Sequence, residues 1–91
     1  MLDLIARHYV ISGRVQGVGF RYFAERAARH AGVTGWVRNL GDGRVEAHAE
    51  GTRQAVDQFE GRLRQGPSRS DIRGFESREA SVTRTESFEV R

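Results

Sequence analysis

The chain contains no cysteine and no lysine. The absence of cysteine excludes disulfides, thiolate metal sites and a cysteine nucleophile. The absence of lysine excludes both a Walker-type phosphate-binding lysine and a Schiff base. All 15 basic residues are therefore arginine, which explains a sequence pI near 10.5.

Long apolar runs, repeats and linkers are also missing, and Pro67 is the single proline. No apolar run approaches the roughly 20 residues of a membrane helix, and the first residues lack the pattern of a signal peptide. The hydrophobic share of 37% and charged share of 30% are ordinary for a globular protein. We therefore expect one domain over residues 1–91 in the cytoplasm. The net charge of +3 favours anionic partners only weakly, because it is small and spread along the chain.

The first half of the chain shows clear periodicity. Alternation predicts a strand over about residues 7–14, with Tyr9 and Ile11 on one face. Apolar residues then recur at helical spacing and predict a helix over residues 20–31, which Gly32 would end. Two strands over about residues 34–40 and 44–50 flank Gly41-Asp42-Gly43, a good tight-turn sequence.

The alternation in the second of these strands predicts that one of its faces is solvated, because Glu46, His48 and Glu50 share it. Thr52 is a candidate N-cap for a second helix, whose buried stripe would consist of Val56, Phe59 and Leu63.

After Pro67 the spacing of Ile72 and Phe75 predicts a strand with a bulge, and Phe88 and Val90 predict a short last strand. The element order is β-α-β-β-α-β with a divided last strand. We expect an α+β, ferredoxin-like sandwich: an antiparallel sheet of four to five strands with two helices on one face.

The strongest chemical feature is the turn before the first helix. Its glycines allow positive φ, so that backbone N–H groups can converge at a helix N-terminus and bind an anion. Arg21 lies in the first turn, where a cation is unfavourable unless an anion binds there. Glycine-rich turns between strands and helices are common, however, and spacing alone leaves the anion-site and structural interpretations equally open.

Residues 13–21 read GRVQGVGFR and resemble the first motif of the acylphosphatases. Residues 35–39 read GWVRN, followed by Gly43, Val45 and Gly51, and resemble the second motif. The resemblance covers essentially the whole chain. It implies hydrolysis of an acyl phosphate to a carboxylate and inorganic phosphate, with no cofactor and no metal.

The resemblance also implies the site residues. The phosphate would be held by the backbone N–H groups of Gln16, Gly17, Val18, Gly19, Phe20 and Arg21 together with the Arg21 guanidinium, and Asn39 would orient the attacking water. The partners implied are a small acyl phosphate and inorganic phosphate, as product and inhibitor. No membrane or nucleic-acid partner is expected, and the protein is expected to act as a monomer. Without the resemblance, Asn39 would be interpreted as a turn residue.

The sequence lacks the residues that other classes of phosphatase need. The aspartates are scattered, and the histidines show no metal-ligand spacing. The main alternative is an RNA-binding module, because ferredoxin-like folds host many. Trp36, Tyr9 and Phe88 could be stacking aromatics of such a sheet, but we expect them in the core. Acylphosphatase-like domains also occur within larger maturation enzymes, and the shortness of this chain favours a free-standing enzyme.

Overall fold

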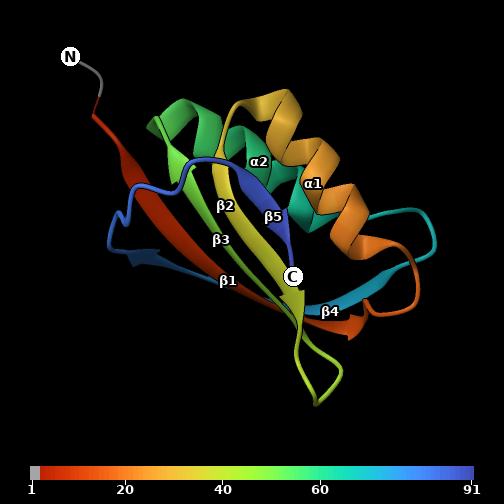
Figure 1. The fold of residues 1–91 in the computed structure, drawn as a ribbon. Helices are drawn as coiled ribbons and strands as arrows, with labels where there is room; N and C mark the ends of the chain where they lie inside the picture. Colours follow the sequence, from red (N-terminus) through yellow and green to blue (C-terminus); the bar gives the residue numbers. More distant parts are fainter. Residues whose placement is uncertain (1–2) are drawn as a thin grey trace.

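The computed structural model describes residues 3–91 of the chain, and its elements follow the expected order (Figure 1). Along these residues the elements are β1 (Ile5–Arg14), α1 (Phe20–Ala31), β2 (Thr34–Asn39), β3 (Val45–Gly51), α2 (Arg53–Gln65), β4 (Asp71–Ala80) and β5 (Phe88–Val90). This is the βαββαβ order with a divided last strand, so the ferredoxin-like fold is confirmed. Neither helix of the described part has the length and hydropathy that a bilayer crossing needs.

The strands form one sheet in the order β4-β1-β3-β2-β5. The pairs β1–β3, β1–β4 and β2–β3 are antiparallel, as predicted. β5 instead runs parallel to β2, so the sheet is mixed, and the expected antiparallel arrangement is wrong at this edge. The reason is that β4 and β5 lie at opposite edges. Residues 81–87 connect these edges and bring β5 in beside the start of β2, where Gly35 pairs with Phe88.

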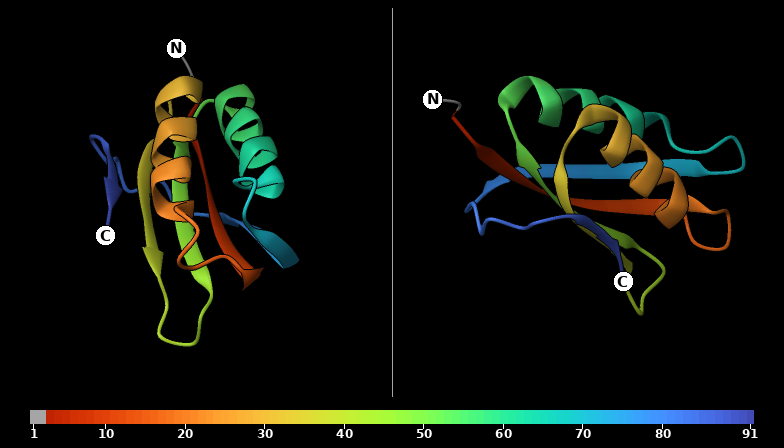
Figure 2. Two further views of the ribbon diagram at one scale, coloured as in Figure 1. Left: turned by 90° about the vertical axis from the view of Figure 1, so that its right-hand side faces the viewer. Right: turned by 45° about the horizontal axis from the view of Figure 1, so that its top comes forward.

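Both helices cover the same face of the sheet, and the apolar core lies between them and the strands (Figure 2). The predicted stripe of α2 is confirmed, because Val56, Phe59 and Leu63 are fully buried. α1 buries most of its predicted stripe, and the sheet contributes alternating residues from β1, β2 and β3. The buried residues of α1 are Phe20, Phe23, Ala24, Ala27 and Ala28, and those of the three strands include Tyr9, Ile11, Val37, Val45, Ala47 and Ala49.

Local signals in the sequence also locate the C-terminal end of α1 and the N-terminal end of α2. Gly32 adopts the left-handed conformation (φ 80°) and its N–H donates to the Ala28 carbonyl, which ends α1. The Thr52 hydroxyl accepts a hydrogen bond from the Ala55 N–H at 3.2 Å, which begins α2. The predicted bulge in β4 is present: consecutive residues of β1 pair with residues 74 and 72, so Arg73 has no partner in the ladder.

The face of the sheet away from the helices differs from the prediction. His48 and Glu50 were expected in solvent, but both are buried, because residues 81–87 cross this face. The Glu50 carboxylate accepts hydrogen bonds from the backbone N–H groups of Thr83 (2.8 Å), Arg84 (2.9 Å) and Thr85 (3.2 Å). It also accepts one from the Thr83 hydroxyl and pairs with His48 Nε2, both at 2.6 Å. Glu50 therefore fastens the β4–β5 connection to the sheet.

The aromatic residues of the sheet divide between its two faces. Tyr9 is fully buried, and Phe88 is half-buried against the core, as expected. Trp36 does not lie in the core, because its neighbour Val37 faces the helices and side chains alternate along a strand. The Trp36 ring stacks on His48, and the Arg91 guanidinium lies 5.0 Å from its centroid.

Acid should weaken the fold through Glu50. Burial alone would raise the pKa of this carboxyl, but the hydrogen bonds from His48 and the 83–85 segment lower the pKa to about 2, from 4.5. A lowered pKa in the folded state stabilises the fold above the unfolded pKa, and the stabilisation is lost as pH falls from about 4.5 towards 2. We expect Glu50→Gln to lose on the order of 1–3 kcal/mol of stability at pH 7 and to show a smaller loss in acid.

Urea denaturation of the wild type and Glu50→Gln at pH 7 and pH 3 measures this effect. Glu86→Gln is the matched control, because the Glu86 side chain is exposed and has no hydrogen bond within residues 3–91. Equal acid sensitivity of the wild type and Glu50→Gln would contradict the assignment.

Candidate active site

The loop between β1 and α1 has the conformation that its glycines predicted. Gly17 (φ 73°) and Gly19 (φ 76°) both lie in the left-handed region, where side chains are rarely tolerated. A Cβ added at either position would meet nothing within 4 Å. The requirement for glycine therefore comes from the backbone conformation, which folds this short loop back into the start of α1.

The backbone N–H groups of this loop are free of protein partners. The first hydrogen bond of α1 runs from the Phe23 N–H to the Gly19 carbonyl at 3.0 Å. Within the described residues, no N–H group from Gln16 to Tyr22 donates to a backbone or side-chain acceptor. Gly19 offers no side-chain cap, and the first turn of α1 holds no acidic residue. Donors that are left unpaired at a helix N-terminus favour an anion.

Arg21 extends from the first turn of α1 towards the edge of the sheet. Its Nη1 atom donates to the backbone oxygen of Arg91 at 2.9 Å. Arg91 is itself fixed beside β2, because its N–H donates to the Val37 carbonyl at 2.9 Å. Among the residues that the structure describes, no aspartate or glutamate side chain pairs with Arg21. Arg21 is half-buried as a residue, its guanidinium is anchored through one nitrogen, and no acidic side chain within residues 3–91 neutralises its charge.

Asn39 is the last residue of β2, opposite Val45 of β3, and its side chain is exposed. The predicted turn follows it and is closed by a hydrogen bond from the Leu40 N–H to the Arg44 carbonyl at 2.8 Å. Asn39 therefore belongs to a strand rather than to the turn. Its side-chain amide has no hydrogen bond to another residue in the 3–91 range.

The side chain of Gln16 joins the loop to this turn. Its Nε2 atom donates to the Leu40 carbonyl at 2.8 Å and to the Arg44 carbonyl at 2.9 Å. Both hydrogens of the amide are used, so the loop and the end of β2 are held at a fixed separation. This link places Asn39 beside the loop, although Gln16 and Leu40 are 24 residues apart in sequence.

These parts enclose a small pocket of about 150 Å³. Its walls include the predicted residues Gln16, Gly17, Gly19, Phe20, Arg21 and Asn39, together with Val15 and Tyr22. Val18 is the one predicted residue that does not line the pocket, and its side chain packs against the core. Ligand pockets for drug-sized molecules measure about 300–1,000 Å³, so this pocket suits a group of phosphate size.

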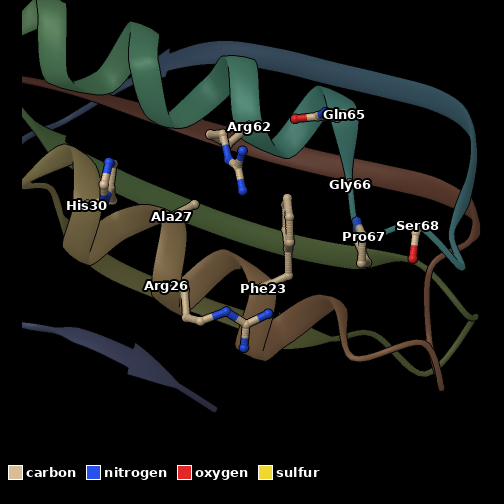
Figure 3. A pocket seen from close by; sticks show the side chains of 9 residues that line it. All are labelled: Phe23, Arg26, Ala27, His30, Arg62, Gln65, Gly66, Pro67 and Ser68. Atoms are coloured by element: carbon tan, nitrogen blue, oxygen red, sulfur yellow. The ribbon is translucent and has the colours of Figure 1, made fainter.

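A larger hollow of about 760 Å³ lies between α1 and α2 (Figure 3). The Arg62 guanidinium lies over the Phe23 ring, 5.2 Å from its centroid, and both project into the space between the helices. None of the predicted site residues lines this hollow. Within residues 3–91 no group of three histidine or acidic side chains is arranged to hold a metal ion.

Sequence reasoning missed three features of the pocket. The side chain of Gln16 links the loop to the β2–β3 turn, whereas the resemblance predicts a role only for its backbone N–H. Tyr22 forms part of the wall, and Arg91 holds the Arg21 side chain. A glutamine or an arginine far along the chain gives no local signal for such contacts, because they depend on how β2 and β5 meet α1.

Comparison with known proteins gives one consistent result. The family model described as Acylphosphatase matches residues 7–90. The chain is 50% identical over 86 residues to a protein named Acylphosphatase from Solibacter usitatus, covering 94% of this chain and 90% of that protein. It is 46% identical over 87 residues to one from Archaeoglobus fulgidus, covering 96% and 98% of the two chains.

Solved structures agree. The fold superposes on the crystal structure of acylphosphatase from Bacillus subtilis with a TM-score of 0.92 and 35% sequence identity, covering 96% of this chain and 98% of that one. The resemblance first indicated by residues 13–21 and 35–39 therefore extends over nearly the whole sequence and the whole fold. The chain belongs to the acylphosphatase family.

Proposed function

We propose that this acylphosphatase holds the phosphoryl group of its acyl phosphate substrate with the backbone N–H groups of residues 16–21 and the guanidinium of Arg21, and that Asn39 orients the attacking water. The reaction is acyl phosphate plus water giving carboxylate and inorganic phosphate. One observation carries the assignment: unpaired N–H donors, an arginine without an acidic side-chain partner and a free amide line the same small pocket.

The electrostatics of α1 support an anionic occupant. A cation in the first turn of a helix opposes the helix dipole and costs about 0.3–1 kcal/mol when exposed. Arg21 is in that position, and no acidic residue of the first turn compensates it. A bound phosphate dianion reverses the sign, because it lies between the positive helix end and the guanidinium. Arginine also presents a planar fork that can donate to two phosphate oxygens.

The chemistry requires few groups. The leaving carboxylate is the conjugate base of an acid with a pKa of about 4–5, so it leaves without protonation and no general acid is needed. Phosphoryl transfer passes through a loose transition state, in which positioning and charge stabilisation do most of the catalysis. The loop N–H groups and Arg21 supply the charge stabilisation.

Asn39 acts as a positioning group for water. An amide does not take up a proton near neutral pH, so Asn39 is not a general base. Its oxygen can accept a hydrogen bond from the water while its nitrogen donates another. In this proposal the water proton passes to an oxygen of the substrate phosphate.

Hydrolysis of benzoyl phosphate in excess EDTA tests the proposal. We expect turnover that EDTA does not reduce and that inorganic phosphate inhibits competitively, because phosphate occupies the same pocket. Turnover lost in EDTA and restored by a divalent cation would contradict the metal-independent mechanism. No turnover together with salt-sensitive RNA binding would favour the RNA-binding alternative instead.

A further inference from the structure

Tyr22 is the most exposed of the three large hydrophobic side chains that lie in solvent in the described part of the chain. Its exposed fraction is 59%, compared with 48% for Leu4 and 36% for Val82. Tyr22 also lines the phosphate-sized pocket, next to Arg21 in the first turn of α1. A side chain that is both a wall of a pocket and mostly in solvent lies at the mouth of that pocket.

The other walls of the pocket already have a structural or proposed role. The side chains of Val15 and Phe20 are buried in the core, and Gly17 and Gly19 have no side chain. The Gln16 side-chain amide donates both of its hydrogens to carbonyls of the β2–β3 turn. Arg21 and Asn39 are assigned to the phosphate and the water.

Tyr22 has no such role. Within residues 3–91 its hydroxyl forms no hydrogen bond, and its ring has neither an aromatic nor a guanidinium partner. Helix stability does not require tyrosine at a solvent-facing position. Tyr22 is therefore the one side chain of the pocket that neither the fold nor the proposed mechanism uses.

The acyl group of the substrate must also be accommodated next to the phosphate. The pocket of about 150 Å³ accommodates the phosphoryl group, so the acyl group must lie at its mouth. An aromatic ring offers a flat apolar face there and loses little side-chain entropy on contact, since tyrosine has few rotatable bonds.

We propose that Tyr22 forms an acyl-group subsite that selects flat, aromatic acyl phosphates over small aliphatic ones. This inference rests on the proposed phosphate site, because the phosphate fixes the position of the acyl group relative to Tyr22. The contact is a ring-to-ring packing contact and involves no covalent step. It acts on the choice of substrate, whereas Arg21 and Asn39 act on every substrate alike.

The test compares benzoyl phosphate with acetyl phosphate. We expect Tyr22→Ala to lower the ratio of kcat/KM for benzoyl over acetyl phosphate by about threefold to tenfold, in the range of aromatic packing contacts, mainly through KM for benzoyl phosphate. Tyr22→Phe should retain most of the ratio, because it keeps the ring. Tyr22→Leu should lose it, because a leucine is apolar but not flat.

Two further measurements separate the subsite from the phosphate site. The inhibition constant of inorganic phosphate reports on the phosphate pocket alone and should change less than twofold in Tyr22→Ala. Leu4→Ala is the matched control, an exposed apolar side chain that does not line this pocket, and it should leave the ratio as in the wild type. An unchanged ratio in Tyr22→Ala with an active wild type overturns the subsite alone. A wild type that hydrolyses neither substrate overturns the proposed function and the subsite together.

Discussion

Replacing Arg21 with glutamine is expected to lower kcat/KM for benzoyl phosphate by about 10³-fold or more. Removal of a single neutral donor from an oxyanion site costs about 10²–10³-fold, and an arginine that stabilises a transferring phosphoryl group is worth about 10³–10⁵-fold. Both kcat and substrate binding should fall, because the guanidinium contacts the phosphate in the ground state and in the transition state. Steady-state kinetics with the purified variant measures this effect.

The fold should survive this substitution. Arg21→Gln removes a cation that opposes the helix dipole, a gain of about 0.3–1 kcal/mol, and loses the hydrogen bond to the Arg91 backbone, a cost of about 0.5–1.5 kcal/mol. These effects nearly cancel, so we expect Arg21→Gln to stay folded and the loss of activity to arise at the site.

Arg26→Gln is the matched control for Arg21→Gln. Arg26 is exposed on the same helix and lines the hollow between α1 and α2 instead of the phosphate-sized pocket. It should retain wild-type kinetics. Arg21→Gln with activity within tenfold of the wild type would remove Arg21 from the mechanism.

Replacing Asn39 with alanine is expected to lower kcat by about 10²-fold and to change KM little. Misplacing a reacting group by about 1 Å can cost 10²-fold, and Asn39 is proposed to position the water and not the substrate. The side chain is exposed and has no protein hydrogen bond within residues 3–91, so stability should stay close to that of the wild type. The separate effects on kcat and KM distinguish this role from that of Arg21.

Gln58→Ala provides the control for Asn39→Ala, because it removes another exposed side-chain amide on the outside of α2. We expect it to be fully active. If Asn39→Ala kept the kcat of the wild type, or raised KM and left kcat intact, Asn39 would not be the group that orients the water.

Much of the fold could be predicted because its signals are local. The alternation in β1, the apolar stripes of both helices, Gly32 and Thr52 each lie within the element that they define. The errors arose where a distant segment decides the environment. Glu50 looks solvated in its own strand, and only the passage of residues 81–87 across the sheet buries it. The parallel direction of β5 also depends on residues 81–87, which carry the chain to the opposite edge of the sheet.

Some features of the site likewise follow from neighbouring residues in the sequence, and others depend on distant contacts. The conformation of Gly17 and Gly19 and the place of Arg21 at a helix N-terminus follow from residues that are neighbours in sequence. The proximity of Asn39 to that loop does not, because it depends on the hydrogen bonds of Gln16 to the next turn. In the sequence alone, only the resemblance to the acylphosphatases connects Asn39 with the phosphate loop.

A titration of the ¹⁵N-labelled protein with inorganic phosphate tests the central claim most directly. The account predicts saturable shifts of the backbone amide signals of residues 16–21, at the phosphate concentration that inhibits turnover, and their absence in Arg21→Gln. Phosphate that inhibits turnover but shifts amides elsewhere, for instance along the hollow between α1 and α2, would contradict it.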